Sequence, residues 1–215
     1  MSIQSHAASL EQLHRSATIL RVVNVWDAIT AKVVADLPET RALATAGHSI
    51  AASHGYADGE IPADEMIAAV ARIVAAVEVP VSADLDDGYA DPGETIRKAI
   101  GVGVVGANVE DRLRPLAESV ARVEAIVKAG EEEGIPFQLN ARTDAFVKGG
   151  DRPLDVILED AIARGNAYLE AGASTIFVPG PIDRNAAEQL VGAFGPGRLS
   201  VIGIPGALTA QEYEE

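Results

Sequence analysis

The stretch Val79-Pro80-Val81-Ser82-Ala83-Asp84-Leu85-Asp86-Asp87-Gly88-Tyr89 is an apolar run that ends in acidic residues. In a β-strand, residues two apart point the same way, so Asp84 and Asp86 project from one face where the strand ends. The next apolar run, within Val104–Asp111, also ends in two acids. Helix caps or solvated turns explain many single pairs of this kind. Two neighbouring strands that both end in acids favour an oxygen-rich pocket, which suits a hard cation such as Mg²⁺.

Apolar runs rich in β-branched residues recur along the chain and alternate with helical patterns. The predicted strands are Ile19–Trp26, Ala42–Ala46, Val79–Ala83, Val104–Val109, Phe137–Ala141, Thr175–Val178 and Leu199–Ile204. The predicted helices are Ala28–Leu37, Ala63–Val77, Gly93–Ile100, Leu116–Glu133, Pro153–Ala171 and Arg184–Phe194. Strands that are apolar on both faces and separated by helices indicate a parallel sheet covered by helices.

Two α/β architectures fit this alternation, an open doubly wound sheet and a closed (β/α)₈ barrel. The glycine-rich phosphate loop of a dinucleotide-binding sheet is missing after the first strand, where Asn24–Ala28 stands instead. Polar residues follow the carboxyl ends of many strands, as in TIM-type barrels. The sequence therefore predicts a (β/α)₈ TIM-type barrel that occupies residues 1–215 as one domain.

Only seven strand units can be counted, so we expect the eighth, C-terminal unit to be missing from this sequence. The sequence stops within a helical pattern, Gln211–Glu215, that has no stop signal. A barrel without its eighth strand leaves the first and seventh strands with unpaired edges. Either the natural chain continues beyond Glu215 or another subunit covers the gap, and we favour the first explanation.

Composition narrows the class of partner. The chain has 17 Lys and Arg against 32 Asp and Glu, a net charge of −15, which repels nucleic acid and anionic membranes. An anionic substrate therefore needs a local cation, either a metal or an arginine. The chain has no cysteine, which excludes disulfides, thiolate metal sites and cysteine nucleophiles. No run is long enough for a membrane span and the N-terminus lacks signal-peptide features, so we expect a cytoplasmic protein.

The fifth predicted strand carries an arginine into the barrel mouth. Asn140, Arg142 and Asp144 share one face by the period of two. An arginine there is costly unless it is paired. Arg142 either forms a structural salt bridge with Asp144, Glu110 or Asp86, or binds a substrate carboxylate through its planar guanidinium.

The second predicted strand ends in Thr45-Ala46-Gly47-His48-Ser49. A glycine beside hydroxyl residues exposes backbone N–H groups that can hold a carboxylate or an oxyanion. The following loop places Asp58 near the same mouth. His48 and His54 are candidate acid–base groups, although a hydrogen-bonding role in the loop is the better explanation of each.

Together these motifs resemble the isocitrate lyase / phosphoenolpyruvate mutase superfamily. The resemblance covers about Ile19 to Pro205 and rests on Asn24–Ala28, Gly55–Gly59, Ala83–Tyr89, Asn108–Asp111 and Asn140–Asp144. It implies a (β/α)₈ barrel, usually a homo-oligomer. It also implies C–C or P–C bond chemistry next to a 2-oxo acid, through an enolate stabilised by Mg²⁺, or by Mn²⁺ in its place.

The resemblance also implies roles for particular residues. Asp84 corresponds to a metal-site carboxylate, and Asp86 and Glu110 correspond to further ligands, partly through water. Arg142 corresponds to the clamp for the substrate carboxylate, and Asp58 to a loop aspartate near the reacting group. The residues implied to bind substrate are Thr45, Gly47, His48, Ser49, Asn140 and Arg142.

The chain departs from the superfamily in the loop after Glu110-Asp111. Lyases of the superfamily carry a Lys/Arg-Cys-Gly-His core there, and mutase members carry a Lys-rich loop, whereas this chain has Arg112-Leu113-Arg114-Pro115. The resemblance therefore favours a Mg²⁺-dependent lyase or hydrolase of a small 2-oxo or 2-hydroxy carboxylate. The alternatives are phosphoenolpyruvate mutase-like or phosphonopyruvate-type P–C chemistry, and a non-catalytic protein that binds carboxylates.

Overall fold

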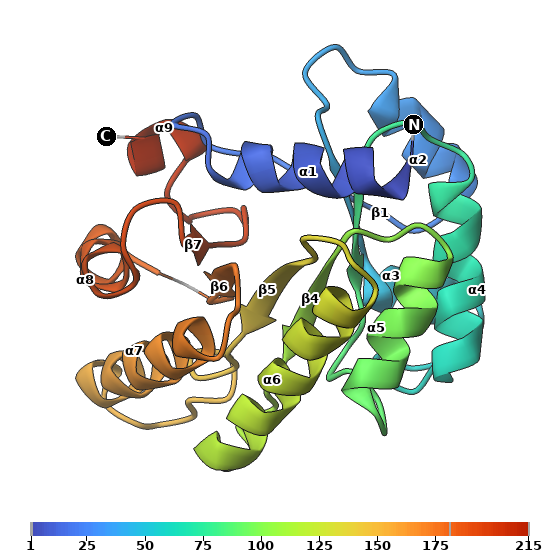
Figure 1. The fold of residues 1–215 in the computed structure, drawn as a ribbon. Helices are drawn as coiled ribbons and strands as arrows, with labels where there is room; N and C mark the ends of the chain where they lie inside the picture. The colour runs from blue at the N-terminus through green and yellow to red at the C-terminus, as the bar shows by residue number, and fades with distance from the viewer. Residues whose placement is uncertain (1, 181, 215) are drawn as a thin grey trace.

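The computed structural model describes residues 2–180 and 182–214, which form a curled parallel sheet surrounded by helices (Figure 1). The strands pair in chain order as β1 (Val23–Val25), β2 (Leu43–Thr45), β3 (Val81–Asp84), β4 (Gly106–Glu110), β5 (Gln138–Arg142), β6 (Thr175–Phe177) and β7 (Leu199–Ser200). The helices are α1 (Ile3–His14), α2 (Ala28–Ala35), α3 (Gly47–Ser53), α4 (Ala63–Val74), α5 (Pro92–Gly101), α6 (Leu116–Glu132), α7 (Leu154–Glu170), α8 (Arg184–Phe194) and α9 (Ala210–Glu214). The predicted TIM-type fold is confirmed, with seven strand units among the described residues.

The register of the sheet aligns polar residues of neighbouring strands. Asp84 lies opposite Asn108, which lies opposite Asn140. Glu110, at the end of β4, lies opposite Arg142, at the end of β5. Because parallel strands end at the same edge of the barrel, this register places acids and an arginine side by side at its carboxyl end.

The helices cover the sheet with apolar faces at helical spacing. In α4, Met66, Ile67, Val70 and Ile73 are buried, and they recur every three or four residues. On the sheet side, alternate residues of β3 such as Val81 and Ala83 are buried against the helices. Burying one such large aliphatic side chain contributes about 1.5–3 kcal/mol, so this layer stabilises the strands that carry the site.

Two helices were not predicted from the sequence. The helix α1 crosses the amino end of the strands, where Leu10 is buried against the start of β4 (Figure 1). A Cβ atom on Gly106 would lie 2.9 Å from Leu10 Cδ2, so the glycine allows this close contact. The helix α1 therefore closes the end of the barrel opposite the acidic residues. The short helix α3 begins at Gly47, where a turn was expected.

The strands at the two edges are shorter than predicted. The run Ile19–Trp26 forms a strand only at Val23–Val25, and Leu199–Ile204 only at Leu199–Ser200. Each edge strand has a single neighbour in the described sheet, so fewer residues find hydrogen-bonding partners. Large apolar residues beside these edges are 39–48% exposed, namely Val22, Val23, Ile202 and Ile204.

The predicted helical run at the C-terminal end is present in α9 up to Glu214, whereas Glu215 lies outside the described residues. Arg21 Nη2 lies 3.7 Å from Glu214 Oε1, which places α9 beside the segment that leads into β1. None of the helices in the described part of the chain is long and apolar enough to cross a membrane.

Candidate functional site

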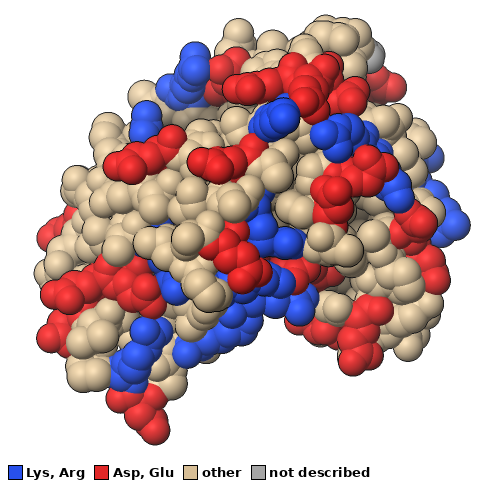
Figure 2. Space-filling view, turned by 60° about the horizontal axis from the view of Figure 1, so that its bottom comes forward, with Lys and Arg blue, Asp and Glu red and all other residues tan. Residues whose placement is uncertain are grey.

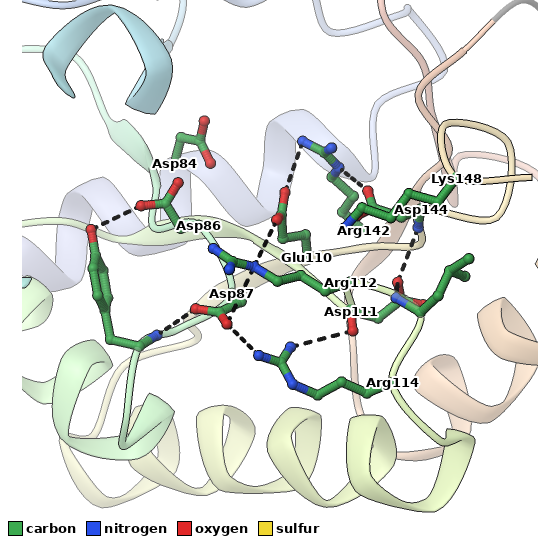
Figure 3. Close-up of polar contacts among 12 residues, drawn as sticks. Asp84, Asp86, Asp87, Glu110, Asp111, Arg112, Arg114, Arg142, Asp144 and Lys148 are labelled. Carbon is green, nitrogen blue, oxygen red and sulfur yellow. Dashed lines mark hydrogen bonds and ion pairs between the residues drawn. The ribbon is translucent and has the colours of Figure 1, made fainter. Parts of the chain in front are cut away.

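The carboxyl ends of β3, β4 and β5 bring together acids and arginines from different strands (Figure 3). Arg142 Nη1 lies 3.2 Å from Glu110 Oε2. The charge of Arg142 also acts on Asp84, and the charge of Asp84 acts on Asp86. The structure therefore places the four residues that the sequence assigned to the site in one cluster.

Asp84 is held by the backbone of the neighbouring strand end. The Gly47 N–H donates to Asp84 Oδ2 at 3.0 Å, and the Asn108 amide donates to Oδ1 at 3.3 Å. Burial raises the pKa of Asp84 above its ordinary value, and the charge of Glu110 raises it further. The two hydrogen bonds and the charge of Arg142 act in the opposite direction. Asp84 is thus positioned as an anion in a place where its charge is poorly solvated.

Asp86 stands on a strained turn immediately after β3. Its φ is 50° and that of Tyr89 is 59°, both in the left-handed region that side chains disfavour. The Tyr89 hydroxyl donates to Asp86 Oδ2 at 3.0 Å. Burial raises the pKa of Asp86, and the charges of Asp84 and Asp58 raise it further. The turn thereby fixes a second carboxylate beside the first, against their mutual repulsion.

Arg142 pairs with two carboxylates of the protein itself. Besides the contact to Glu110, its Nε donates to Asp144 Oδ1 at 2.8 Å. Asp144 is fully buried, and Lys148 Nζ lies 2.7 Å from its Oδ2 atom. The guanidinium carbon also lies 6.0 Å from the centre of the Phe177 ring. The salt bridges to Asp144 and Glu110 that the sequence offered as one alternative are therefore present, and the substrate-clamp role stays a prediction.

The acidic side chains of the cluster differ in whether their charge is already paired within the protein or is free to bind a divalent cation. Among residues 2–180 and 182–214, no group of three or more His, Asp or Glu has the arrangement of a metal site. Glu110 is engaged by Arg142 and by Arg112, so its carboxylate is already neutralised. Asp84 and Asp86 receive only hydrogen bonds from neutral groups in the described chain. Neither aspartate forms an ion pair within the described chain, although the charges of Arg142 and Arg112 act on them from a distance. Two such neighbouring carboxylates fit a hard cation whose other ligands are water.

The remaining predicted residues lie around this cluster at different depths. Thr45 is buried and its Oγ1 accepts the Asp84 backbone N–H at 2.9 Å. Asn140 Oδ1 accepts the Thr175 hydroxyl at 2.8 Å. In the first turn of α3, His48 is exposed and Ser49 is half-buried, whereas Asp58 is exposed on the loop after α3. The expected backbone cradle exists at Gly47, but in this structure its N–H group binds Asp84.

Four polar residues at the site were not assigned a role from the sequence. They are Asn108 and Tyr89, which bind the two aspartates, and Arg112 and Lys148, which pair with Glu110 and Asp144. The alternation within β4 places Asn108 on the same face as Glu110, so this residue had a readable signal. The other three follow strand ends in loops, where no local pattern gives the direction of a side chain.

The face at the carboxyl end of the sheet carries cations despite the net charge of −15. Figure 2 shows Lys and Arg side chains gathered near the middle of the face turned forward, with Asp and Glu around them. A cavity of about 20 Å³ behind the site, between β4, β5 and α6, is lined by Glu110, Ser119 and Arg142 among others. It has room for about one water molecule, so a substrate would approach from the open end of the strands.

Gly47→Ala is expected to weaken metal binding about tenfold or more, because an added Cβ would lie 2.9 Å from Asp84 Oδ2 and displace that carboxylate. Gly192→Ala is the matched control, since an added Cβ there meets no atom within 4 Å. Mg²⁺ titrations of both variants by calorimetry would measure the effect. Equal affinity in the two variants would contradict the placement of Asp84 at the metal.

A TIM-type sheet with paired acids after β3 and an arginine after β5 agrees with the superfamily that the motifs resemble. The chain matches the family model described as phosphoenolpyruvate phosphomutase over residues 10–215, and it belongs to this family, within the PEP mutase/isocitrate lyase superfamily. It is 32% identical over 191 residues to 2,3-dimethylmalate lyase from Eubacterium barkeri, covering 81% of this chain and 63% of that protein. This chain therefore spans less than two thirds of that relative.

Two further proteins match a larger share of this chain and of their own length. Oxaloacetate decarboxylase from Rhodopseudomonas palustris (strain HaA2) is 28% identical, over 99% of this chain and 76% of its own length. A crystal structure from Burkholderia cenocepacia J2315, of a protein that carries the provisional name phosphonomutase, has a TM-score of 0.92 and 35% identity. The match covers 99% of this chain and 88% of the chain in that structure.

Proposed function

We propose that this protein is a Mg²⁺-dependent lyase that breaks a C–C bond next to the carbonyl or hydroxyl group of a small 2-oxo or 2-hydroxy carboxylate. The observation that carries the proposal is the pair Asp84 and Asp86, two neighbouring carboxylates that form no ion pair with any described residue and that feel the charge of the nearby, preorganised Arg142. The relatives named as 2,3-dimethylmalate lyase and oxaloacetate decarboxylase support this class of chemistry.

The proposed reaction needs charge stabilisation on one oxygen atom of the substrate. Cleavage next to a carbonyl leaves a carbanion whose charge delocalises onto the oxygen as an enolate. A divalent cation, when bound by Asp84 and Asp86 with water, would stabilise that charge by several kcal/mol. Mn²⁺ offers the same oxygen preference as Mg²⁺.

The protein's own residues would hold the substrate carboxylate. Arg142 is fixed by its contacts to Glu110 and Asp144, so its orientation is set before the substrate arrives. We assign Asp58 a role beside the reacting group, because its charge already acts on Asp86 across the mouth. Substrate contacts are assigned to Thr45, Gly47, His48, Ser49 and Asn140. Thr45 and Gly47 contact Asp84, His48 and Ser49 follow Gly47 in α3, and Asn140 lies in register with Asp84 through Asn108.

P–C bond chemistry is the second candidate, and the family description together with the Burkholderia cenocepacia structure favours it. The loop after Glu110-Asp111 lacks the Lys-rich pattern of mutase members, which is why we place this candidate second. A non-catalytic carboxylate-binding role is the third candidate. The same acids and arginine would bind a carboxylate ligand even if the protein did not convert that ligand to a product.

A substrate panel separates these three functions. Release of pyruvate or glyoxylate would be measured from 2-hydroxy and 2-oxo diacids and from phosphonopyruvate, each with Mg²⁺, with Mn²⁺ and with a chelator. We expect turnover of a 2-hydroxy or 2-oxo diacid, and we expect this turnover to be lost when the chelator is added. Turnover of phosphonopyruvate alone would favour P–C chemistry, and saturable binding without any turnover would favour the non-catalytic role. Undiminished turnover in the chelator would contradict the metal requirement.

A further inference from the structure

Arg112 reaches the site with part of its guanidinium uncommitted. Both of its ion pairs use Nε, at 3.1 Å from Glu110 Oε1 and 3.3 Å from Asp87 Oδ2. Within the described chain, its two Nη groups have no hydrogen-bond acceptor, and the side chain is 38% exposed. Figure 3 shows this side chain extending toward Asp86. The Nη edge of a guanidinium is the edge that binds a carboxylate through two parallel hydrogen bonds.

The turn that carries Arg112 is anchored in the protein interior. Arg112 and Leu113 both have left-handed backbone angles, with φ of 49° and 54°. Asp111, which is buried, accepts the Leu113 N–H at 2.8 Å and the Tyr168 hydroxyl at 2.7 Å. Such angles persist only where surrounding contacts impose them. The direction of the Arg112 side chain is therefore built into the turn.

The loop across the mouth accommodates this guanidinium. A Cβ on Gly59 would lie 3.1 Å from Arg112 Nη2, so the loop that carries Asp58 passes directly beside the Nη edge. Arg112 and Arg142 bind the two different oxygens of Glu110. The two guanidinium groups thus flank one carboxylate, that of Glu110.

We propose that Arg112 is a specificity-determining residue whose Nη edge binds a second carboxylate of the substrate, while Arg142 binds the first. The inference rests on the proposed function and assigns the residue by which the site distinguishes a dicarboxylate from a monocarboxylate. A chain with a net charge of −15 repels a dianion at long range. Two fixed guanidinium groups at the mouth would supply the local attraction that binding a dianion requires. A monocarboxylate would leave the Nη edge of Arg112 without a carboxylate to bind.

Malate and lactate test the inference, because both are 2-hydroxy acids and only malate has the second carboxylate. Their dissociation constants would be measured by calorimetry in the presence of Mg²⁺ for the parent protein, Arg112→Ala, Arg112→Lys and Arg97→Ala. Arg97 is the matched control, since its side chain is also 38% exposed and pairs with surface glutamates on α5 and α6. Thermal midpoints would verify that each variant is folded.

We expect the parent to bind malate more tightly than lactate. Arg112→Ala should weaken malate binding about ten- to a hundredfold and change lactate binding less than about twofold, as the loss of a charged hydrogen-bond pair predicts. Arg112→Lys should recover part of the malate affinity, and Arg97→Ala should change neither constant. Equal losses for both ligands, or unchanged malate binding, would overturn the role of Arg112 and leave the proposed function standing. A parent protein that binds neither ligand would overturn both.

Discussion

Asp84→Ala and Asp84→Asn are expected to abolish detectable Mg²⁺ binding, a loss of at least about a hundredfold in affinity, and to abolish activity with it. Asp84 is one of two carboxylates at the site that form no ion pair with a described residue, so its removal takes away one of the two proposed metal ligands and its negative charge. Calorimetric titration with Mg²⁺ measures the affinity, and the substrate panel measures the activity.

The same substitutions should leave the metal-free fold intact or stabilise it. Burial raises the pKa of Asp84 in the folded state, so the folded protein binds a proton there more tightly than the unfolded chain does. The stability from this group is therefore fully present below its unfolded pKa and is lost as the pH rises through its raised folded pKa, because the buried carboxylate is a cost once it is charged. Asparagine removes that cost and keeps the shape, so the thermal midpoint without metal should stay equal or rise.

A control separates the ligand role from a general effect of charge. Asp64→Asn also removes one negative charge, but its side chain is 82% exposed on α4 and pairs with Lys98. We expect this variant to bind Mg²⁺ as the parent does. If Asp84→Asn also bound Mg²⁺ with the parent's affinity, Asp84 would not be a ligand.

Arg142→Ala is expected to lower kcat/KM by about a hundred- to a thousandfold, the usual cost of removing a charged hydrogen-bonding group from a substrate carboxylate. It should also lower the free energy of unfolding by about 3 kcal/mol. The reason is that Asp144 is fully buried and would keep only the exposed Lys148 as a partner. Steady-state kinetics and denaturant unfolding measure the two effects.

Arg142→Lys distinguishes the structural role from the binding role. Lysine keeps the positive charge near Asp144, but it cannot pair with Asp144 and Glu110 in the present geometry and also present a planar edge to a substrate. We therefore expect it to recover most of the stability and little of the activity. Parental kcat/KM in this variant would show that Arg142 acts only as a structural cation.

The parts of the fold that depend on local pattern were predictable. Strand and helix alternation, with strands apolar on both faces, indicated a parallel sheet covered by helices, and the structure has it in chain order. The helix Arg184–Phe194 was predicted with the bounds that the structure shows. The helix α1 was missed because it is stabilised by packing against the start of β4, a contact between residues about a hundred positions apart in the chain.

The candidate site also has some residues whose positions were predictable from local pattern and others whose positions were not. Period-two alternation was sufficient to place Asn140 with Arg142 on one face of β5, whereas Asp86 lies beside Asp84 because of the left-handed turn that follows β3. That Glu110 lies beside Arg142 depended on the register between β4 and β5, which the shared carboxyl edge of a parallel sheet made predictable. These residues are the ones on which the proposed function rests.

The sequence by itself determined a parallel α/β sheet and the acids and arginine at its carboxyl end, because strand periodicity is a local property of the chain. Only the tertiary structure decided which of the possible charge pairs form. Glu110 pairs with both Arg142 and Arg112, whereas Asp84 and Asp86 form no ion pair within the described chain and accept hydrogen bonds from neutral groups. The side-chain direction of Arg112 follows from a turn held by buried Asp111, a contact that reaches across the core to α7. Such pairings depend on long-range packing, on which local spacing carries no information.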